Sequence, residues 1–247
     1  VNLGYHYPAG LAWNLELWVH PSQGDDGDTG TAEDHPLKSI TRALTLAAPR
    51  TRIHLAAGRY TNNVETFPLT INDRTVQLLG TNAAQTVIDA GGATSQALRV
   101  LDTFGHNRLA HLTVTGGSYS DQFGGGIYCR QCHLDVSHCV IATNEVRWGG
   151  QYQDSYGGGL YALRSGVNVT ETIFDGNRAR GTAYSSAGRG GGLCFDAGYM
   201  RIVRTVFRNN GARFEASSYT GGGFGGAAYL ENGVARFYGV LAITNHI

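Results

Sequence analysis

The amino-acid sequence predicts an all-β protein, a parallel β-helix of three-strand coils with a short capping helix near the N-terminus. One observation is a motif of 21 residues that occurs four times. A second is the period-two alternation of apolar residues inside each copy, which indicates strands with one buried face. A third is the placement of Gly and Asn at the two ends of every copy, where a coil has to turn.

The four copies align without a gap. Their origins are separated by 33, 33 and 35 residues, and each copy closes on Asn at the same offset. The copies begin at Gly124, Gly157, Gly190 and Gly225 and end at Asn144, Asn177, Asn210 and Asn245. Repeats of this period are typical of a solenoid in which each unit stacks on the next.

Each copy predicts three short strands. In the first copy the inward residues are Ile127 and Cys129, Leu134 and Val136, and Cys139 and Ile141. No strand of this length can bury its apolar face alone. Equivalent strands of successive copies can pair in parallel at about 4.8 Å, so that the inward residues form columns in a shared core.

Glycine and asparagine account for the turns between these strands. Asn tolerates the left-handed backbone region better than most residues, and stacked Asn side chains can hydrogen-bond along a ladder. The glycines offer positive φ and close approach of the backbone. A phosphate-binding role is disfavoured because no helix follows the glycines. We therefore expect both motifs to build the fold.

The same rhythm continues upstream with less regularity. The segment LAHLTVTGG places Leu112 over Cys139, Val114 over Ile141 and Gly117 over Asn144. Earlier strand-like runs predict the first coils. Helical spacing then appears near the N-terminus, after Pro36, in the apolar residues Leu37, Ile40, Ala43, Leu44 and Ala47. We expect a short amphipathic helix that covers the open end of the β-helix.

Residues 17–60 resemble the N-terminal segment of right-handed parallel β-helix proteins of the pectate-lyase-like superfamily. The resemblance lies in a strand with a Pro-Ser turn, an Asp/Gly-rich loop, a Pro-initiated capping helix and a strand closing in Gly-x-Tyr. Here these elements are Val19 to Ser22, Gly24 to Thr31, Pro36 to Ala48 and Ile53 to Tyr60. The later repeats resemble those of bacterial surface β-helix proteins of the polymorphic outer-membrane and adhesin type. The resemblance implies a fold and leaves the activity open.

We expect three parts in the chain. Residues 1–16 are predicted to be a leader or linker from a longer chain, because the sequence opens without an initiator Met or a basic segment. Residues 17–60 are predicted to form the N-terminal strand, loop and capping helix. Residues 61–247 are predicted to form the coils, open at the C-terminal end, where further coils or another copy would continue the stack.

Composition excludes several classes of function. The formal net charge of the 247 residues is zero, so no basic surface for nucleic acid is expected. No run of about 18 apolar residues occurs, so no membrane span is expected. The superfamily resemblance and the surface-protein repeats imply an extracellular or cell-surface location in a bacterium.

Four cysteines are too few to build a body of this size from disulfides. A Cys129–Cys132 or a Cys132–Cys139 bridge would fit an oxidising compartment, and free thiols packed as small apolar side chains fit equally well. Zinc binding by Cys129 and Cys132 would need a second ligand pair, and none follows at the expected spacing.

An enzymatic role is the competing hypothesis, as a polysaccharide lyase or glycoside hydrolase acting on an acidic polysaccharide. A lyase needs a base and a cation that stabilises the enolate, but the one lysine, Lys38, falls in the predicted capping helix. No arginine is singled out as a base. Hydrolysis needs paired carboxyl groups, and the acids of the repeats stand singly in the sequence. We therefore assign no catalytic residue.

An acidic loop near the N-terminus offers candidate ligands for calcium. Asp25, Asp26 and Asp28 supply the oxygen atoms that this cation prefers. Their spacing does not match an EF-hand, and a solvated turn-rich loop explains the same residues. No other cofactor is expected.

The segments between each Asn and the next glycines are predicted to be loops that emerge along one edge of the β-helix. They carry aromatic residues beside arginines, which suits stacking on sugar rings. The rings could instead fold back over the sheet. The candidate ligand-binding residues are Trp148, Tyr152, Tyr156, Tyr184, Arg189, Phe214 and Tyr219. We therefore expect a structural, adhesive or glycan-binding surface whose partner is a polysaccharide or further β-helix.

Overall fold

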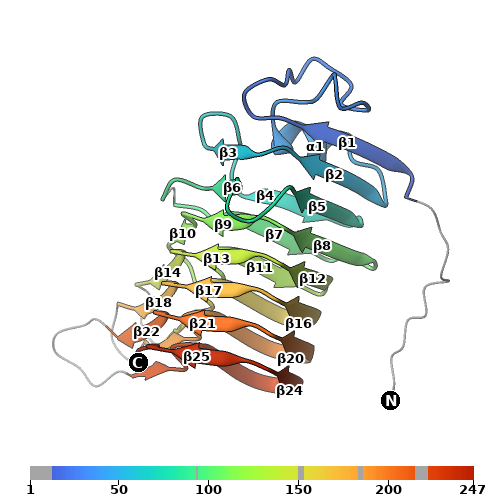
Figure 1. Cartoon of the computed structure of the whole chain (residues 1–247). Helices are drawn as coiled ribbons and strands as arrows, with labels where there is room; N and C mark the ends of the chain where they lie inside the picture. The colour runs from blue at the N-terminus through green and yellow to red at the C-terminus, as the bar shows by residue number, and fades with distance from the viewer. Residues whose placement is uncertain (1–12, 93, 150–152, 183–185, 215–221) are drawn as a thin grey trace.

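The computed structural model describes residues 13–92, 94–149, 153–182, 186–214 and 222–247. These residues form a parallel β-solenoid of about seven turns with one short helix near the N-terminus (Figure 1). Strands of successive coils lie side by side from the N-terminal to the C-terminal end of the stack. The predicted parallel β-helix is therefore confirmed.

The largest sheet contains two parallel stacks that meet in the later coils. One stack begins with β1 (Leu15–Val19), β2 (Thr51–Leu55), β5 (Val76–Gly80), β8 (His106–Ala110) and β12 (His133–Ser137). The other begins with β4 (Leu69–Asn72), β7 (Leu98–Leu101) and β11 (Ile127–Arg130). Both continue into β16 (Leu160–Thr170), β20 (Leu193–Val203) and β24 (Ala228–Tyr238).

These long strands differ from the two separate strands expected in each copy. The bend survives at residues with positive φ, which are Arg164 in β16, Ala197 and Gly198 in β20, and Asn232 in β24. The pairing between β16 and β20 skips the position of Arg164 and Ala197 and then resumes. The corner is therefore made by one or two residues with positive φ, too short an interruption to end the strand.

A second sheet supplies the third side of each coil. Its strands are β3 (Gly58–Thr61), β6 (Thr86–Asp89), β9 (Thr113–Thr115), β13 (Val140–Ala142), β17 (Ile173–Asp175), β21 (Val206–Arg208) and β25 (Leu241–Ile243). Its register pairs Val114 with Ile141, as the repeat alignment predicts.

The predicted loops form two further parallel ladders close to the coils. One contains β10 (Ser118–Tyr119), β14 (Glu145–Trp148), β18 (Arg178–Gly181) and β22 (Gly211–Phe214). The other contains β15 (Ser155–Tyr156), β19 (Gly188–Arg189) and β23 (Gly223–Phe224). Because successive copies have nearly equal lengths, the emerging backbones reach one another and pair as the coils do.

The core consists of columns of inward side chains. Leu134 and Val136 lie in register with Val167 and Val169, and all four are buried. On the other side of the coil, the buried rings of Phe174 and Phe207 stack with centroids 4.7 Å apart. Dispersion contacts and burial of these columns stabilise one coil against the next.

The closing asparagines form the predicted ladder. The Asn144 Nδ2 group donates to Oδ1 of Asn177 at 3.1 Å, and Asn177 Nδ2 donates to Oδ1 of Asn210 at 2.9 Å. Asn210 Nδ2 in turn donates to Oδ1 of Asn245 at 2.9 Å. Each of these amides also donates to a backbone carbonyl, such as that of Ile141. The buried amides are thus paired along the stack, as burial requires.

The repeated glycines make a turn and a close approach, as predicted. Gly157, the first glycine of the second copy, has a φ of +66°. A Cβ atom on the next residue, Gly158, would lie 2.3 Å from the carbonyl oxygen of Arg178. A side chain is therefore excluded at Gly158, where the chain lies close to the backbone of the loop ladder.

The capping helix α1 (Ile40–Leu46) is shorter than the predicted Pro36 to Ala48. Leu37 pairs with Val19 in a parallel bridge, so the chain is still extended after Pro36. The helix begins only after the N-cap residue Ser39, whose hydroxyl accepts from the backbone N–H of Arg42. Ile40, Ala43 and Leu44 bury one face against β1, β2 and β4 at the N-terminal end.

The two ends of the chain differ. Residues 1–12 lie outside the described residues, and β1 begins at Leu15, so the predicted division at residue 16 stays a prediction. In the last coil, Leu230 and Phe237 are exposed, although their register partners in the preceding coil, Phe195 and Ile202, are buried. What continues this end of the stack also stays a prediction.

The cysteines separate into a pair and two single thiols. Cys129 and Cys132 form a disulfide across the first corner of their coil, so these two sulfur atoms are not available to zinc. Cys139 and Cys194 are free and buried. No helix in the described part of the chain is both long and apolar enough to cross a membrane.

Candidate functional site

Two columns of mostly aromatic side chains face each other beside the glycine turns. The first column stands directly before the first glycine of each copy and contains Phe123, Tyr156, Arg189 and Phe224. The second stands four residues after the first glycine and contains Tyr128, Tyr161, Cys194 and Tyr229. The first column comes from the loop ladders and the second from the largest sheet, so the fold brings them together.

The rings of the two columns stack on one another. The centroid of Phe123 lies 4.9 Å from that of Tyr161 and 5.6 Å from that of Tyr156. Tyr161 is only 2% exposed, whereas Phe123 and Tyr156 are half-buried. The second column therefore supports the first, and the rings of Phe123 and Tyr156 keep accessible surface.

Arg189 occupies the aromatic column in the third copy. Its guanidinium lies 5.0 Å from the ring centroids of both Phe224 and Tyr229. The same group donates from Nε to a carboxylate oxygen of Asp154 and from Nη1 to the hydroxyl of Tyr229. These contacts fix the arginine side chain between the two columns.

A cavity of about 340 Å³ opens beside these rings. We call it the aromatic cavity. Its aromatic lining consists of Phe123, Tyr156 and Tyr161, its acidic lining of Asp154, Asp196 and Glu231, and the remainder of Gln122, Gln153 and Leu163. Aromatic faces beside amide and carboxylate groups are the usual lining of a site for a polar organic ligand.

The phenol groups of the cavity stay protonated at neutral pH. Burial and, to a smaller extent, the nearby Asp154 carboxylate raise the pKa of Tyr156 to about 12. Burial also raises the pKa of Tyr161. Neither phenol is therefore available as a base near neutral pH.

The structure distributes the seven predicted ligand-binding residues over three places. Tyr156 lines the aromatic cavity, and Arg189 does not line it but donates to the lining residue Asp154. Trp148 and Phe214 occupy one register position of the outer ladder, at the ends of β14 and β22, and do not line the cavity. The other three, Tyr152, Tyr184 and Tyr219, lie outside the described residues.

Sequence reasoning did not assign the three carboxylates and Phe123 to a site. The signal is present in the repeat alignment, because Asp196 and Glu231 stand six residues after Gly190 and Gly225. The same alignment places Phe123 over Tyr156. Reading the copies as columns of one stack would have found the cluster that the linear sequence scatters.

The acidic loop near the N-terminus serves the capping helix. One oxygen of Asp26 accepts from the backbone N–H groups of Lys38 and Ser39, and the other accepts from the Ser39 hydroxyl. Asp25 accepts from the backbone of Gly27, which closes a turn. Asp28, the third candidate, lies in the same loop. Among the described residues, no group of three or more His, Cys, Asp or Glu is placed to hold a metal ion.

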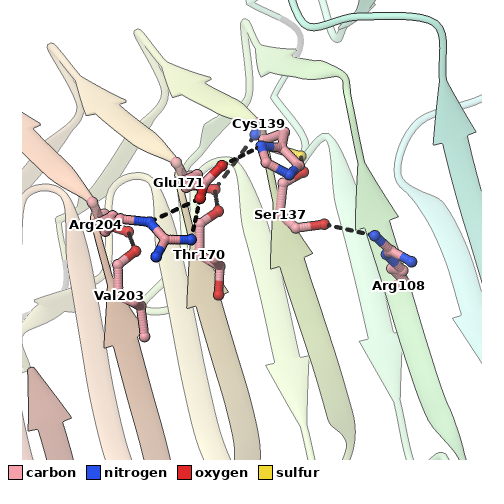
Figure 2. A network of polar contacts seen from close by, with 10 residues as sticks. Arg108, Ser137, Cys139, Thr170, Glu171, Val203 and Arg204 are labelled. Carbon is pink, nitrogen blue, oxygen red and sulfur yellow. Dashed lines mark hydrogen bonds and ion pairs between the residues drawn. The ribbon is translucent and has the colours of Figure 1, made fainter. Parts of the chain in front are cut away.

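A second polar column runs along a turn on another edge (Figure 2). Residues with positive φ occupy the same corner of successive coils, namely His111, His138, Glu171 and Arg204. The His138 ring lies parallel to that of His111, and its Nδ1 contacts Glu171 at 2.9 Å. Glu171 accepts in turn from Arg204 Nε at 2.8 Å. This chain of polar contacts links four coils.

Fold and site together define a parallel β-helix protein with an aromatic-lined cavity along one side. Residues 22–125, less than half of the chain, match the model of a family described as "Protein of unknown function (DUF1565)". No curated protein matches the sequence. Among solved structures, a rhamnogalacturonan lyase is similar at 12% identity and a TM-score of 0.37, over 94% of this chain and 69% of that one.

Proposed function

We propose that this chain is a secreted or cell-surface β-helix module that binds a glycan in the aromatic cavity. The observation that carries the proposal is the pair of half-buried rings, Phe123 and Tyr156, that line a cavity with carboxylate and amide groups beside them. Sugar faces stack on such rings while their hydroxyls bond to the polar groups. The rigid ladders beneath the rings reduce the entropic cost of ordering the site.

The disulfide supports the extracellular location. Bridges such as Cys129–Cys132 persist in oxidising compartments and are rare in the cytosol. A surface location also suits a rigid stack of coils, which would present the cavity to polymers outside the cell and serve an adhesive role.

Titration calorimetry against a panel of neutral, amino and acidic oligosaccharides tests the proposal. At least one class should bind, and Tyr156→Ala should weaken its binding about tenfold or more through loss of the stacking surface. Tyr238→Ala is the control, because this exposed tyrosine lies at the far end of β24 and does not line the cavity. Absence of binding to every class, or equal loss in both variants, would contradict the proposal.

Hydrolysis of a glycan is the second candidate function. Asp154, Asp196 and Glu231 bring to one cavity the carboxyl groups that acid and base catalysis requires. Lyase chemistry is less well supported, because Arg189 is already bound to Asp154 and Lys38 precedes the capping helix. Product formation from polysaccharides, with calcium present or chelated, tests this alternative. Turnover abolished by Asp196→Asn would favour the hydrolase over the binding module.

A further inference from the structure

We propose that the ligand of the aromatic cavity is a glycan with free amino groups, and that the cavity disfavours uronate glycans. This inference rests on the proposed function, since it names the class of glycan that the same cavity selects. The rings and the cavity define the site, and the charges around them decide which sugars fit.

The balance of charge at the cavity is negative. Three carboxylates line it, and the described lining residues include no Arg, Lys or His. The guanidinium of Arg189 contacts one lining residue, Asp154, and also donates to the hydroxyl of Tyr229. For Asp196 the described structure gives a neutral partner, the Asn232 side chain at 3.1 Å. Asp196 and Glu231 thus remain free to attract a cation.

Asp196 and Glu231 form a pair of like charges on adjacent coils. They are register partners in β20 and β24, so their backbones are separated by about one strand spacing of 4.8 Å. The two carboxylates also act on the nearby Cys194 thiol. Burial raises the pKa of this thiol most, and the charges of Asp196 and Glu231 raise it further. An ammonium group between the two carboxylates would relieve their repulsion, whereas a third carboxylate would increase it.

The half-buried rings favour the same choice. The face of an aromatic ring carries negative charge, and ammonium groups are attracted to it. Phe123 and Tyr156 present such faces beside the carboxylates. A uronate in this position would lose hydration and gain no cation in exchange. Rings and carboxylates therefore select together for an amino sugar.

Calorimetry with three oligosaccharides of equal length tests the inference. The probes are glucosamine oligomers, the same oligomers N-acetylated, and oligogalacturonate. We expect the glucosamine oligomers to bind about two- to fivefold more tightly than the acetylated ones, which is within the range for partly exposed charge pairs. The preference should shrink in high salt and vanish when the pH is raised enough to deprotonate the amines.

The double variant Asp196→Asn, Glu231→Gln keeps the shape of the cavity and removes both charges. It should lose the preference, so that free-amine and acetylated oligomers bind this variant with equal affinity. Asp135→Asn is the matched control, because Asp135 also accepts from an Asn of the next coil, Asn168, and lies outside the cavity.

The outcomes separate the two proposals. Equal binding of acetylated and free-amine oligomers, or tighter binding of oligogalacturonate, overturns the amino-sugar inference and leaves glycan binding in place. Tighter binding of the free amines that persists in the double variant also overturns it. Failure of all three probes and of the wider panel overturns the proposed function itself.

Discussion

Asn177→Ala is the most informative test of the fold, because this buried side chain joins three coils. Its Oδ1 accepts from the backbone N–H of Asn144 and from Asn144 Nδ2, both at 3.1 Å. Its Nδ2 donates to the carbonyl of Ile141 at 2.8 Å and to Oδ1 of Asn210 at 2.9 Å. The substitution removes all four hydrogen bonds from the interior.

The cost follows from the groups that lose their partner. Two donors of Asn144, itself 1% exposed, are left without their acceptor. An unsatisfied buried polar group costs about 1–3 kcal/mol, so the free energy of unfolding should fall by roughly 2–6 kcal/mol. Asn168→Ala is the control: its amide makes one hydrogen bond, to Asp135 on the outer face, and its loss should cost about 1 kcal/mol.

Urea unfolding followed by far-UV circular dichroism measures the difference. The midpoint of Asn177→Ala should lie well below those of the wild type and of Asn168→Ala, at a similar denaturant slope. Equal midpoints for the two variants would refute the reasoning that the ladder stabilises the stack through satisfied buried amides.

Three further predictions follow from particular residues. Gly158→Ala should lower the free energy of unfolding by at least about 2 kcal/mol, because its Cβ atom would meet the Arg178 carbonyl. Gly149→Ala should change it little, because the nearest atom would lie 3.5 Å from the new Cβ. Thermal denaturation compares the stability of the two variants. Alkylation without reductant should label no cysteine in the native protein and only Cys139 and Cys194 in denaturant; labelling of Cys129 or Cys132 would contradict the disulfide. Burial and the charge of His106 lower the pKa of His133, so the unfolded chain binds this proton more readily. The resulting stability is present above the ordinary histidine pKa of about 6.5 and is lost as the pH falls through the folded value, and His133→Gln should reduce the fall in urea midpoint between pH 7.5 and 5.

The sequence predicts most of the fold because its signals repeat. Residues equivalent to Asn177 and Gly157 occur at the same offset in every copy, so each supplies the same turn in every coil. The structure confirms the asparagine ladder and the positive φ of the first glycines. The start of the capping helix is set differently. The Asp26 carboxylate holds the backbone of Lys38 and Ser39 from 12 and 13 residues away, and no local propensity encodes that contact.

The candidate site was only partly predictable for a related reason. Tyr156 and Arg189 attract attention in the sequence because they stand in aromatic segments outside the repeat core. Asp196 and Glu231 each occur once in their copy, and only the parallel register places them together beside Phe123. A site whose residues come from different coils can be found by aligning the repeats as columns of one stack.

A crystal structure with the tightest-binding oligosaccharide of the panel would show whether the aromatic cavity binds a glycan. We expect a sugar ring against the faces of Phe123 and Tyr156, with an amino group near Asp196 and Glu231. A saccharide seated elsewhere, such as the cavity of about 270 Å³ beside Trp18 and His54, with the aromatic cavity empty, would contradict it.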